Sequence, residues 1–305
     1  MRSILGAAAI LLLSAGSSRA APPDCLAYEA GEDGSPVIQA MVQGQGPFAF
    51  VLDTASSGTT VDEATAERLA LPRDAETETA QGLGGPMDVR LHRVARLTAG
   101  PLTLTDFPAP AIPAPALEGR DIVGLAGVDL FGQALATWNA APGCVTVGAS
   151  GARPGGDDWR PVAVQWIRPW KILLPIRIGA VEGWGLLDTG AQHTVLNPVF
   201  ADRLGLTPAS GRLGDGGAII GIDGRPLALS LAQVEAVSIG QWRWDRAALR
   251  IGDLPVFARL GETDAPLAVI GADWLGGQGF AIDYGAEAVW QRRPGTTVSV
   301  DNANP

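Results

Sequence analysis

Short apolar runs separated by glycine pairs dominate the chain, and two of these runs end in the same way. The first run leads directly into Asp53 and the second directly into Asp188. Apolar runs of this length, such as the one within residues 36–52, are typical of β-strands joined in hairpins. An aspartate at the end of an apolar strand is costly to bury unless a neighbouring group uses or neutralises it. The pattern predicts a mostly β chain with two acidic loops that require a partner.

One short helix is expected after each acidic loop. Asp62 and Asn197 are suited to the N-cap position, because their side chains can accept a hydrogen bond from a free amide of the first turn. Glu63 and Pro198 suit the first helical position, and Gly205 suits the end of the second helix.

The chain contains an internal repeat. Residues 36–71 align on residues 171–206 without a gap, at an offset of 135 positions, so that Asp53 falls on Asp188. Two later blocks match in the same order at slightly larger offsets: residues 84–100 with 224–240, and 125–131 with 269–275. Two copies in one chain predict two related lobes, with small loop insertions in the second.

Composition divides the chain into a leader, two lobes, a linker and a tail. The N-terminal residues contain Arg2, an apolar run and small residues, as secretory signal peptides do; a retained N-terminal anchor is the alternative. We expect a signal peptide over 1–20, an N-terminal lobe over 21–150, a linker over 151–160, a C-terminal lobe over 161–290 and a polar tail over 291–305. Export would place the protein in the periplasm or the extracellular space.

The chain is acidic, with 22 basic and 32 acidic residues and a net charge of −10. No block of basic residues is present, so we expect neither nucleic acid nor, after signal removal, a membrane as a partner. There are two histidines and no HExxH motif, and we expect no metal and no other cofactor.

The two cysteines of the chain are Cys25 and Cys144. In an oxidising compartment they can pair and close a loop of about 120 residues, which the chain-entropy model credits with roughly 3–5 kcal/mol. The alternative is two separate free thiols, one of them buried. No CxxC motif is present, so dithiol redox chemistry is not expected.

Several features together resemble the aspartic protease family, and its retropepsin-like branch most closely. They are an Asp-Thr-Gly/Ala loop after apolar residues, a short helix, a glycine-bearing hairpin, and an apolar segment containing Gly-x-Asp, and they cover most of residues 36–284. The two copies resemble a retropepsin dimer fused into one chain, with pepsin as a bilobal relative. The resemblance implies an all-β, bilobal acid-protease fold, with two related β-barrel-like lobes and one short helix after each Asp-Thr loop.

The resemblance implies that Asp53 and Asp188 form a catalytic dyad. Two carboxylates about 3 Å apart cannot both ionise, so the pair shares one proton. One carboxylate then accepts a proton from water, while the other donates to the scissile carbonyl oxygen. The titration belongs to the pair, so the sequence leaves open which aspartate is the acid.

The resemblance also assigns supporting roles around the dyad. Thr54 and Thr189 are expected to hydrogen-bond across the lobe interface, and small residues at the next positions let the loops approach. Gly190 fits the family pattern, whereas Ala55 stands where glycine is usual. The glycines expected to pack beneath the active loops are Gly127 and Gly271, and the aspartates that follow them, Asp129 and Asp273, are expected to serve structural turns.

Residues 82–94 and 221–234 are either two mobile flaps that close over substrate or two surface turns. The flap candidates are Gly84, Gly85, Pro86, Gly224, Arg225 and Pro226.

The resulting prediction is an aspartic endopeptidase that binds an extended peptide or protein substrate and acts as a monomer with pseudo-twofold lobes. The alternative is a catalytically inactive peptide-binding or scaffold module on the same fold, which Ala55 favours. A third hypothesis is a homodimer in which the repeat is only structural, and it predicts that Asp53 and Asp188 lie far apart.

Overall fold

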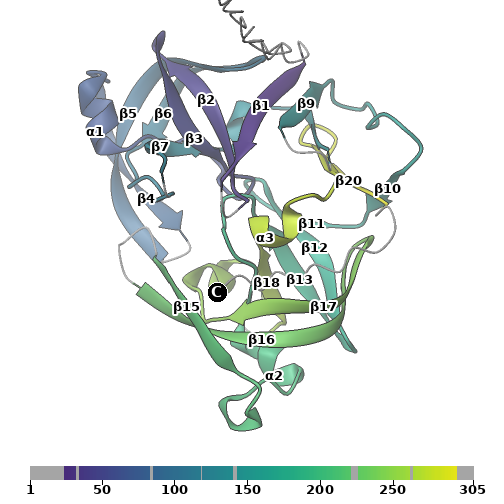
Figure 1. The fold of residues 1–305 in the computed structure, drawn as a ribbon. Coiled ribbons are helices and arrows are strands. Elements are labelled where there is room, and N and C mark those ends of the chain that lie inside the picture. Colours follow the sequence, from purple (N-terminus) through teal and green to yellow (C-terminus); the bar gives the residue numbers. More distant parts are fainter. Residues whose placement is uncertain are drawn as a thin grey trace, which may run out of the picture.

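The computed structural model describes residues 24–31, 34–82, 85–117, 119–139, 143–220, 226–261 and 264–293, and the expected signal peptide lies outside them. Strands account for most of the regular structure (Figure 1). Those of the first copy are β1 (Cys25–Ala30), β2 (Pro36–Val42), β3 (Gln45–Leu52), β4 (Arg73–Gly82), β5 (Gly85–Ala99), β6 (Leu102–Pro110), β7 (Ile122–Ala126), β8 (Leu135–Trp138) and β9 (Cys144–Gly148). Those that follow are β10 (Trp159–Val162), β11 (Gln165–Ile167), β12 (Lys171–Ile178), β13 (Val181–Leu187), β14 (Val195–Leu196), β15 (Gly214–Ile220), β16 (Pro226–Ile239), β17 (Trp242–Ile251), β18 (Leu267–Ile270), β19 (Phe280–Asp283) and β20 (Ala288–Arg292).

The helices are short. They are α1 (Glu63–Arg68), α2 (Pro198–Arg203) and α3 (Ala272–Leu275), with 3-10 turns η1 (Val128–Leu130), η2 (Pro208–Ser210) and η3 (Pro255–Arg259). The Asp62 side chain caps α1 and the Asn197 side chain caps α2, as predicted, and Gly205 ends the second helical segment at a φ of 68°. Within the part of the chain described, no helix combines the length and apolar character needed to cross a membrane.

The internal repeat corresponds to a repeated arrangement of strands, which confirms the predicted all-β, two-lobe fold. In the first copy β2 pairs antiparallel with β3, and β3 pairs parallel with β7. In the second copy β12 pairs antiparallel with β13, and β13 pairs parallel with β18. Each acidic loop therefore begins at the end of a strand that lies between two neighbours, β3 before Asp53 and β13 before Asp188.

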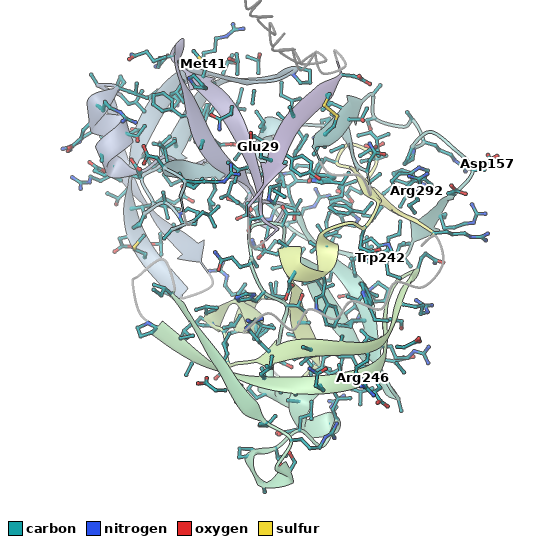
Figure 2. The ribbon with its side chains drawn as sticks, viewed as in Figure 1. Glu29, Met41, Asp157, Trp242, Arg246 and Arg292 are labelled. Atoms are coloured by element: carbon teal, nitrogen blue, oxygen red, sulfur yellow. A yellow bond between two sulfur atoms is a disulfide. The ribbon has the colours of Figure 1, made fainter. Side chains whose placement is uncertain are left out.

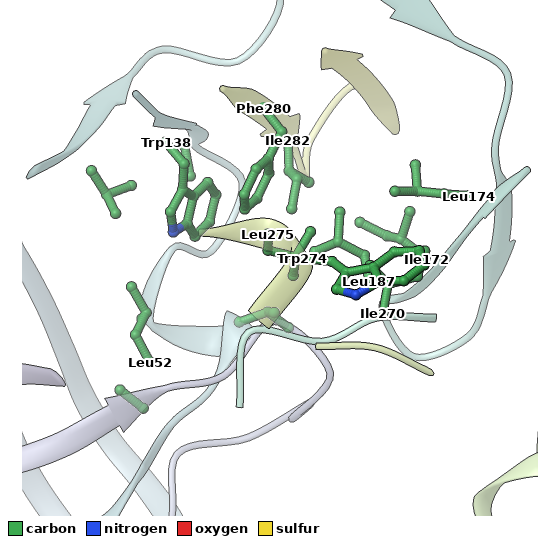
Figure 3. Close-up of a cluster of buried hydrophobic side chains, with 14 of the residues drawn as sticks. Leu52, Trp138, Ile172, Leu174, Leu187, Ile270, Trp274, Leu275, Phe280 and Ile282 are labelled. Atoms are coloured by element: carbon green, nitrogen blue, oxygen red, sulfur yellow. The ribbon is translucent and has the colours of Figure 1, made fainter. Parts of the chain in front are cut away.

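A shared sheet joins the lobes, in the order β10, β20, β19, β8, β9, β1. The pairing of β19 with β8 places Phe280 opposite Trp138, and their rings stack with centroids 4.7 Å apart. Figure 3 shows these rings in one core with Leu52 and Leu187, the residues that precede the two aspartates. β10 begins inside the segment expected as a linker, and β20 includes the first residues of the expected tail.

Cys25 and Cys144 form a disulfide between the neighbouring strands β1 and β9, where Figure 2 draws it in yellow. The alternative of two free thiols is therefore wrong. The bond links residues 119 positions apart and ties the start of the first lobe to its last strand.

Replacing both cysteines by alanine is expected to lower the free energy of unfolding by about 2–5 kcal/mol, because the unfolded chain gains the freedom of a long open loop. Urea denaturation of the variant and the oxidised wild type measures the difference. The reduced wild type serves as the control and should match the variant. Equal unfolding midpoints for the oxidised protein and the variant would contradict a stabilising role.

Candidate catalytic site

The two acidic loops meet at the junction of the lobes. The backbone amide of Asp53 donates to the carbonyl of Ala126 on β7 (3.0 Å), and that of Asp188 donates to Ile270 on β18 (3.1 Å). The parallel neighbour strands thus hold both loops in the same way. The carboxyl groups of Asp53 and Asp188 are close enough to affect each other's ionisation. This proximity contradicts the third hypothesis, which required the aspartates to lie far apart.

Backbone amides fix one oxygen of each carboxyl group. Oδ1 of Asp53 accepts from the amides of Ala55 (2.8 Å) and Ser56 (3.0 Å). Oδ1 of Asp188 accepts from the matching amides of the second loop, both at 3.0 Å. The loop amides therefore bind Oδ1 in both copies and leave Oδ2 of each carboxyl outside these contacts.

The two carboxyl groups differ in proton affinity. Burial raises the pKa of Asp53 above its usual value, although the amide of Ala55 and the Lys171 ammonium oppose that effect. Burial also raises the pKa of Asp188, and the negative charge of Asp53 raises it further, to well above the usual range. Asp188 is 4% exposed, whereas Asp53 is partly exposed. The surroundings thus raise the pKa of both carboxyl groups, and that of Asp188 further, because it also feels the charge of Asp53.

Thr54 and Thr189 lock the loops together across the lobe interface. The Thr54 hydroxyl donates to the Leu187 carbonyl (3.0 Å) and accepts from the Thr189 amide (3.0 Å). The Thr189 hydroxyl donates to the Leu52 carbonyl (2.6 Å) and accepts from the Thr54 amide (3.1 Å). Both threonines are buried, so these four reciprocal hydrogen bonds tie the two loops together away from solvent.

Thr189→Val is expected to lower the free energy of unfolding by about 2–6 kcal/mol, because it leaves the Leu52 carbonyl and the Thr54 amide each without a partner at about 1–3 kcal/mol per group. Thr189→Ser keeps the hydroxyl and is the matched control. Urea unfolding of both variants measures the effect. If the valine and serine variants proved equally stable, the hydrogen bonds would not account for the cohesion of the loops.

Gly190 and Ala55 occupy matching positions but face different surroundings. A Cβ atom at Gly190 would lie 2.5 Å from Cγ of Asp53, a distance that real side chains do not adopt. The methyl group of Ala55 instead packs against a buried apolar cluster of the second lobe that includes Leu173 and Leu186. Glycine is thus required at 190 by Asp53, whereas alanine at 55 leaves the amide contact to Asp53 intact.

Gly127 and Gly271 lie beneath the two loops. A Cβ atom at Gly127 would approach the Gly58 backbone to 2.5 Å, and one at Gly271 would approach the His193 backbone to 2.6 Å. The loops are also braced by Thr59, whose hydroxyl donates to Asp129 (2.7 Å), and by its repeat partner Thr194, which donates to Asp273 (2.7 Å). Sequence reasoning assigned these threonines no role, although their alignment in the repeat was a usable signal.

Hairpins occupy both flap positions. In the first, β4 and β5 pair up to Gly82 opposite Gly85. A Cβ atom at Gly85 would lie 3.8 Å from Pro255, so the end of this hairpin reaches η3 of the other lobe. In the second, β15 and β16 pair up to Ile220 opposite Pro226. Pro86 follows on β5, and the candidates Gly84, Gly224 and Arg225 lie outside the described residues.

The hollow found in the structure lies away from the two aspartates. A hollow of about 290 Å³ lies between β5 and the start of α1, but it contains neither Asp53 nor Asp188, and one of its walls, Glu63, already pairs with Arg90 (3.5 Å). Its position argues against a role in dyad chemistry. Across the described ranges, no group of three or more His, Cys, Asp or Glu side chains is placed to hold a metal ion.

Comparison with known proteins agrees with this geometry. A family model described as Aspartyl protease matches residues 38–130 and 174–274, two segments that contain Asp53 and Asp188 respectively. No curated protein matches the chain.

Proposed function

The chain belongs to the aspartyl protease family, and from this premise we propose that it is an endopeptidase in which Asp53 and Asp188 activate a water molecule. The observation that carries the proposal is the pair of matching loops from the two repeats. Four reciprocal hydrogen bonds through Thr54 and Thr189 hold these loops against each other, so that the two carboxyl groups interact. Burial and mutual repulsion favour a pair that holds one proton, which is the form that this chemistry needs.

The proposed reaction has two stages. Ionised Asp53 takes a proton from water as the water oxygen attacks the peptide carbonyl carbon, and protonated Asp188 donates its proton to the carbonyl oxygen. The product is a tetrahedral diol. A diol hydroxyl then returns a proton to Asp188 while the proton on Asp53 passes to the amide nitrogen, and the carbon–nitrogen bond breaks. Both aspartates end in their starting states, and no covalent intermediate with the enzyme forms.

The proposed substrate is an extended peptide or a protein segment. The two hairpins supply strands near the site with which an extended chain can pair as an added strand. The Cys25–Cys144 disulfide suits an oxidising compartment, and we place the activity in the periplasm or the extracellular space. A monomer suffices, because one chain supplies both aspartates.

Incubation of the protein with a mixed peptide library between about pH 4 and 7, followed by mass spectrometry of the fragments, tests the proposal. We expect cleavage that a pepstatin-type inhibitor blocks and that Asp53→Asn removes. Binding without fragments, unchanged in Asp53→Asn, would instead identify a peptide-binding module. The sequence feature that favoured this module is Ala55, which stands where glycine is usual. In the structure its methyl group packs against the second lobe.

A further inference from the structure

Lys171 is the only lysine in the chain, alongside 21 arginines, and its side chain reaches the acidic loops. It opens β12 in the second lobe, and its ammonium group donates to the Ala55 carbonyl in the first lobe (2.8 Å). In the internal repeat Lys171 aligns with Pro36, so the first lobe has no counterpart. The cation therefore breaks the pseudo-twofold symmetry at the dyad.

The backbone just before Lys171 has an unusual conformation that packing holds in place. Trp170 has a φ of 97°, a conformation that costs a non-glycine residue about 1–3 kcal/mol and that is often found at functional sites. The guanidinium of Arg168 lies over the Trp170 ring, 5.7 Å from its centroid, and pairs with Glu287. The Trp170 ring also meets Tyr284 edge-on at 6.3 Å. The contacts of the Trp170 ring with Arg168 and Tyr284 thus stabilise the strained backbone at Trp170.

The charge of Lys171 acts on both members of the dyad. Its positive charge lowers the pKa of Asp53 and of Asp188, in each case against the larger effect of burial. Tyr284, the residue after β19, also interacts with Asp53. Its hydroxyl stays neutral because burial and the Asp53 charge raise its pKa.

Further charged groups lie behind the loops. Asp129 and Asp273 are held behind the loops by Thr59 and Thr194. The charges of His193 and Arg250 act on Asp273.

We infer that Lys171 is a positioning residue whose charge sets the pH range in which the dyad holds a single proton, while its hydrogen bond to Ala55 ties the first loop to β12. This inference rests on the proposed function. A nearby cation favours ionised carboxylates. It therefore lowers the pH at which the doubly protonated pair loses its first proton, and also the pH at which the pair loses its second proton. The fixed amine thereby adapts the enzyme to a more acidic working range than the dyad alone would have.

Three substitutions separate charge from hydrogen bonding. Lys171→Arg keeps the charge, Lys171→Gln keeps a donor without the charge, and Lys171→Met removes both. We expect both limbs of the pH profile of kcat/KM to move up by about one pH unit in the Gln and Met variants, and to stay in place in the Arg variant. A profile that does not move in Gln and Met, or that moves equally in Arg, would overturn the inference.

A second readout does not require turnover. Because the chain has a single lysine, isotope-labelled lysine gives one side-chain amine signal by nuclear magnetic resonance. We expect this signal to shift with pH as the dyad titrates, and the shift to disappear in the double variant Asp53→Asn, Asp188→Asn. An amine signal insensitive to that double substitution would refute the electrostatic link, whether or not peptides are cleaved. Failure of wild-type cleavage with an intact shift would refute the proposed function alone.

Discussion

Asp188→Asn is expected to abolish peptide cleavage and to raise the melting temperature at neutral pH. Cleavage falls because asparagine cannot hold and return the shared proton, and we expect kcat to drop at least about 10⁴-fold. Stability rises because burial and the charge of Asp53 make ionisation of Asp188 costly in the folded state, and asparagine removes that cost without removing the polar contacts. The expected gain is a few degrees, at roughly 2–4 °C per kcal/mol.

The stability gain expected for Asp188→Asn depends on pH. The pKa of folded Asp188 lies above that of the unfolded chain, so the folded state binds more protons between these values and wild-type stability falls as pH rises through that window. Below the usual range of aspartate, about pH 4, both states are protonated and the cost vanishes. Thermal melts should show a gain for Asp188→Asn at pH 7 that shrinks toward pH 4.

Asp202→Asn is the matched control, because it makes the same change in charge at an exposed position on α2. We expect its cleavage rate and melting temperature to equal those of the wild type. A gain for Asp188→Asn that grew toward low pH, or cleavage that survived the substitution, would show that Asp188 does not carry the buried proton.

Gly190→Ala is expected to lower kcat/KM by at least about 100-fold, whereas the mirror change Ala55→Gly is expected to leave it within a few-fold. The new methyl group at 190 would collide with Cγ and Oδ2 of Asp53, at 2.5 and 2.6 Å, and would displace that carboxyl from Asp188. At 55 the methyl group is lost from an apolar cluster, which costs about 1–2 kcal/mol of stability without moving a carboxyl.

Kinetics on one peptide substrate, with urea unfolding of both variants, distinguishes these effects. Strong cleavage by Gly190→Ala would mean that the loops tolerate a methyl group on either side. A large rise in activity in Ala55→Gly would show that Ala55 obstructs the dyad, contrary to its packing.

The repeat, the strands and the helix starts could be read from the chain because they depend on neighbours close in sequence. A strand needs a local run of apolar residues, and the caps at Asp62 and Asn197 reach amides three residues ahead. The alignment of Asp53 with Asp188 also came from the sequence, since duplicated segments keep their pattern of residues.

Only the tertiary structure decided which residues of the two lobes contact each other. The partners of Thr54 and Thr189 lie more than 130 positions away, and packing of the lobes brings them together. The uneven burial of the two aspartates depends on that same packing, as does the direction of the Ala55 methyl group. Lys171 gave no sequence signal as a partner of the dyad, because its contact with Ala55 spans 116 positions and has no repeat counterpart. Local patterns determine which strands form, whereas contacts between distant segments determine proton affinity, because burial and charge act through space rather than along the chain.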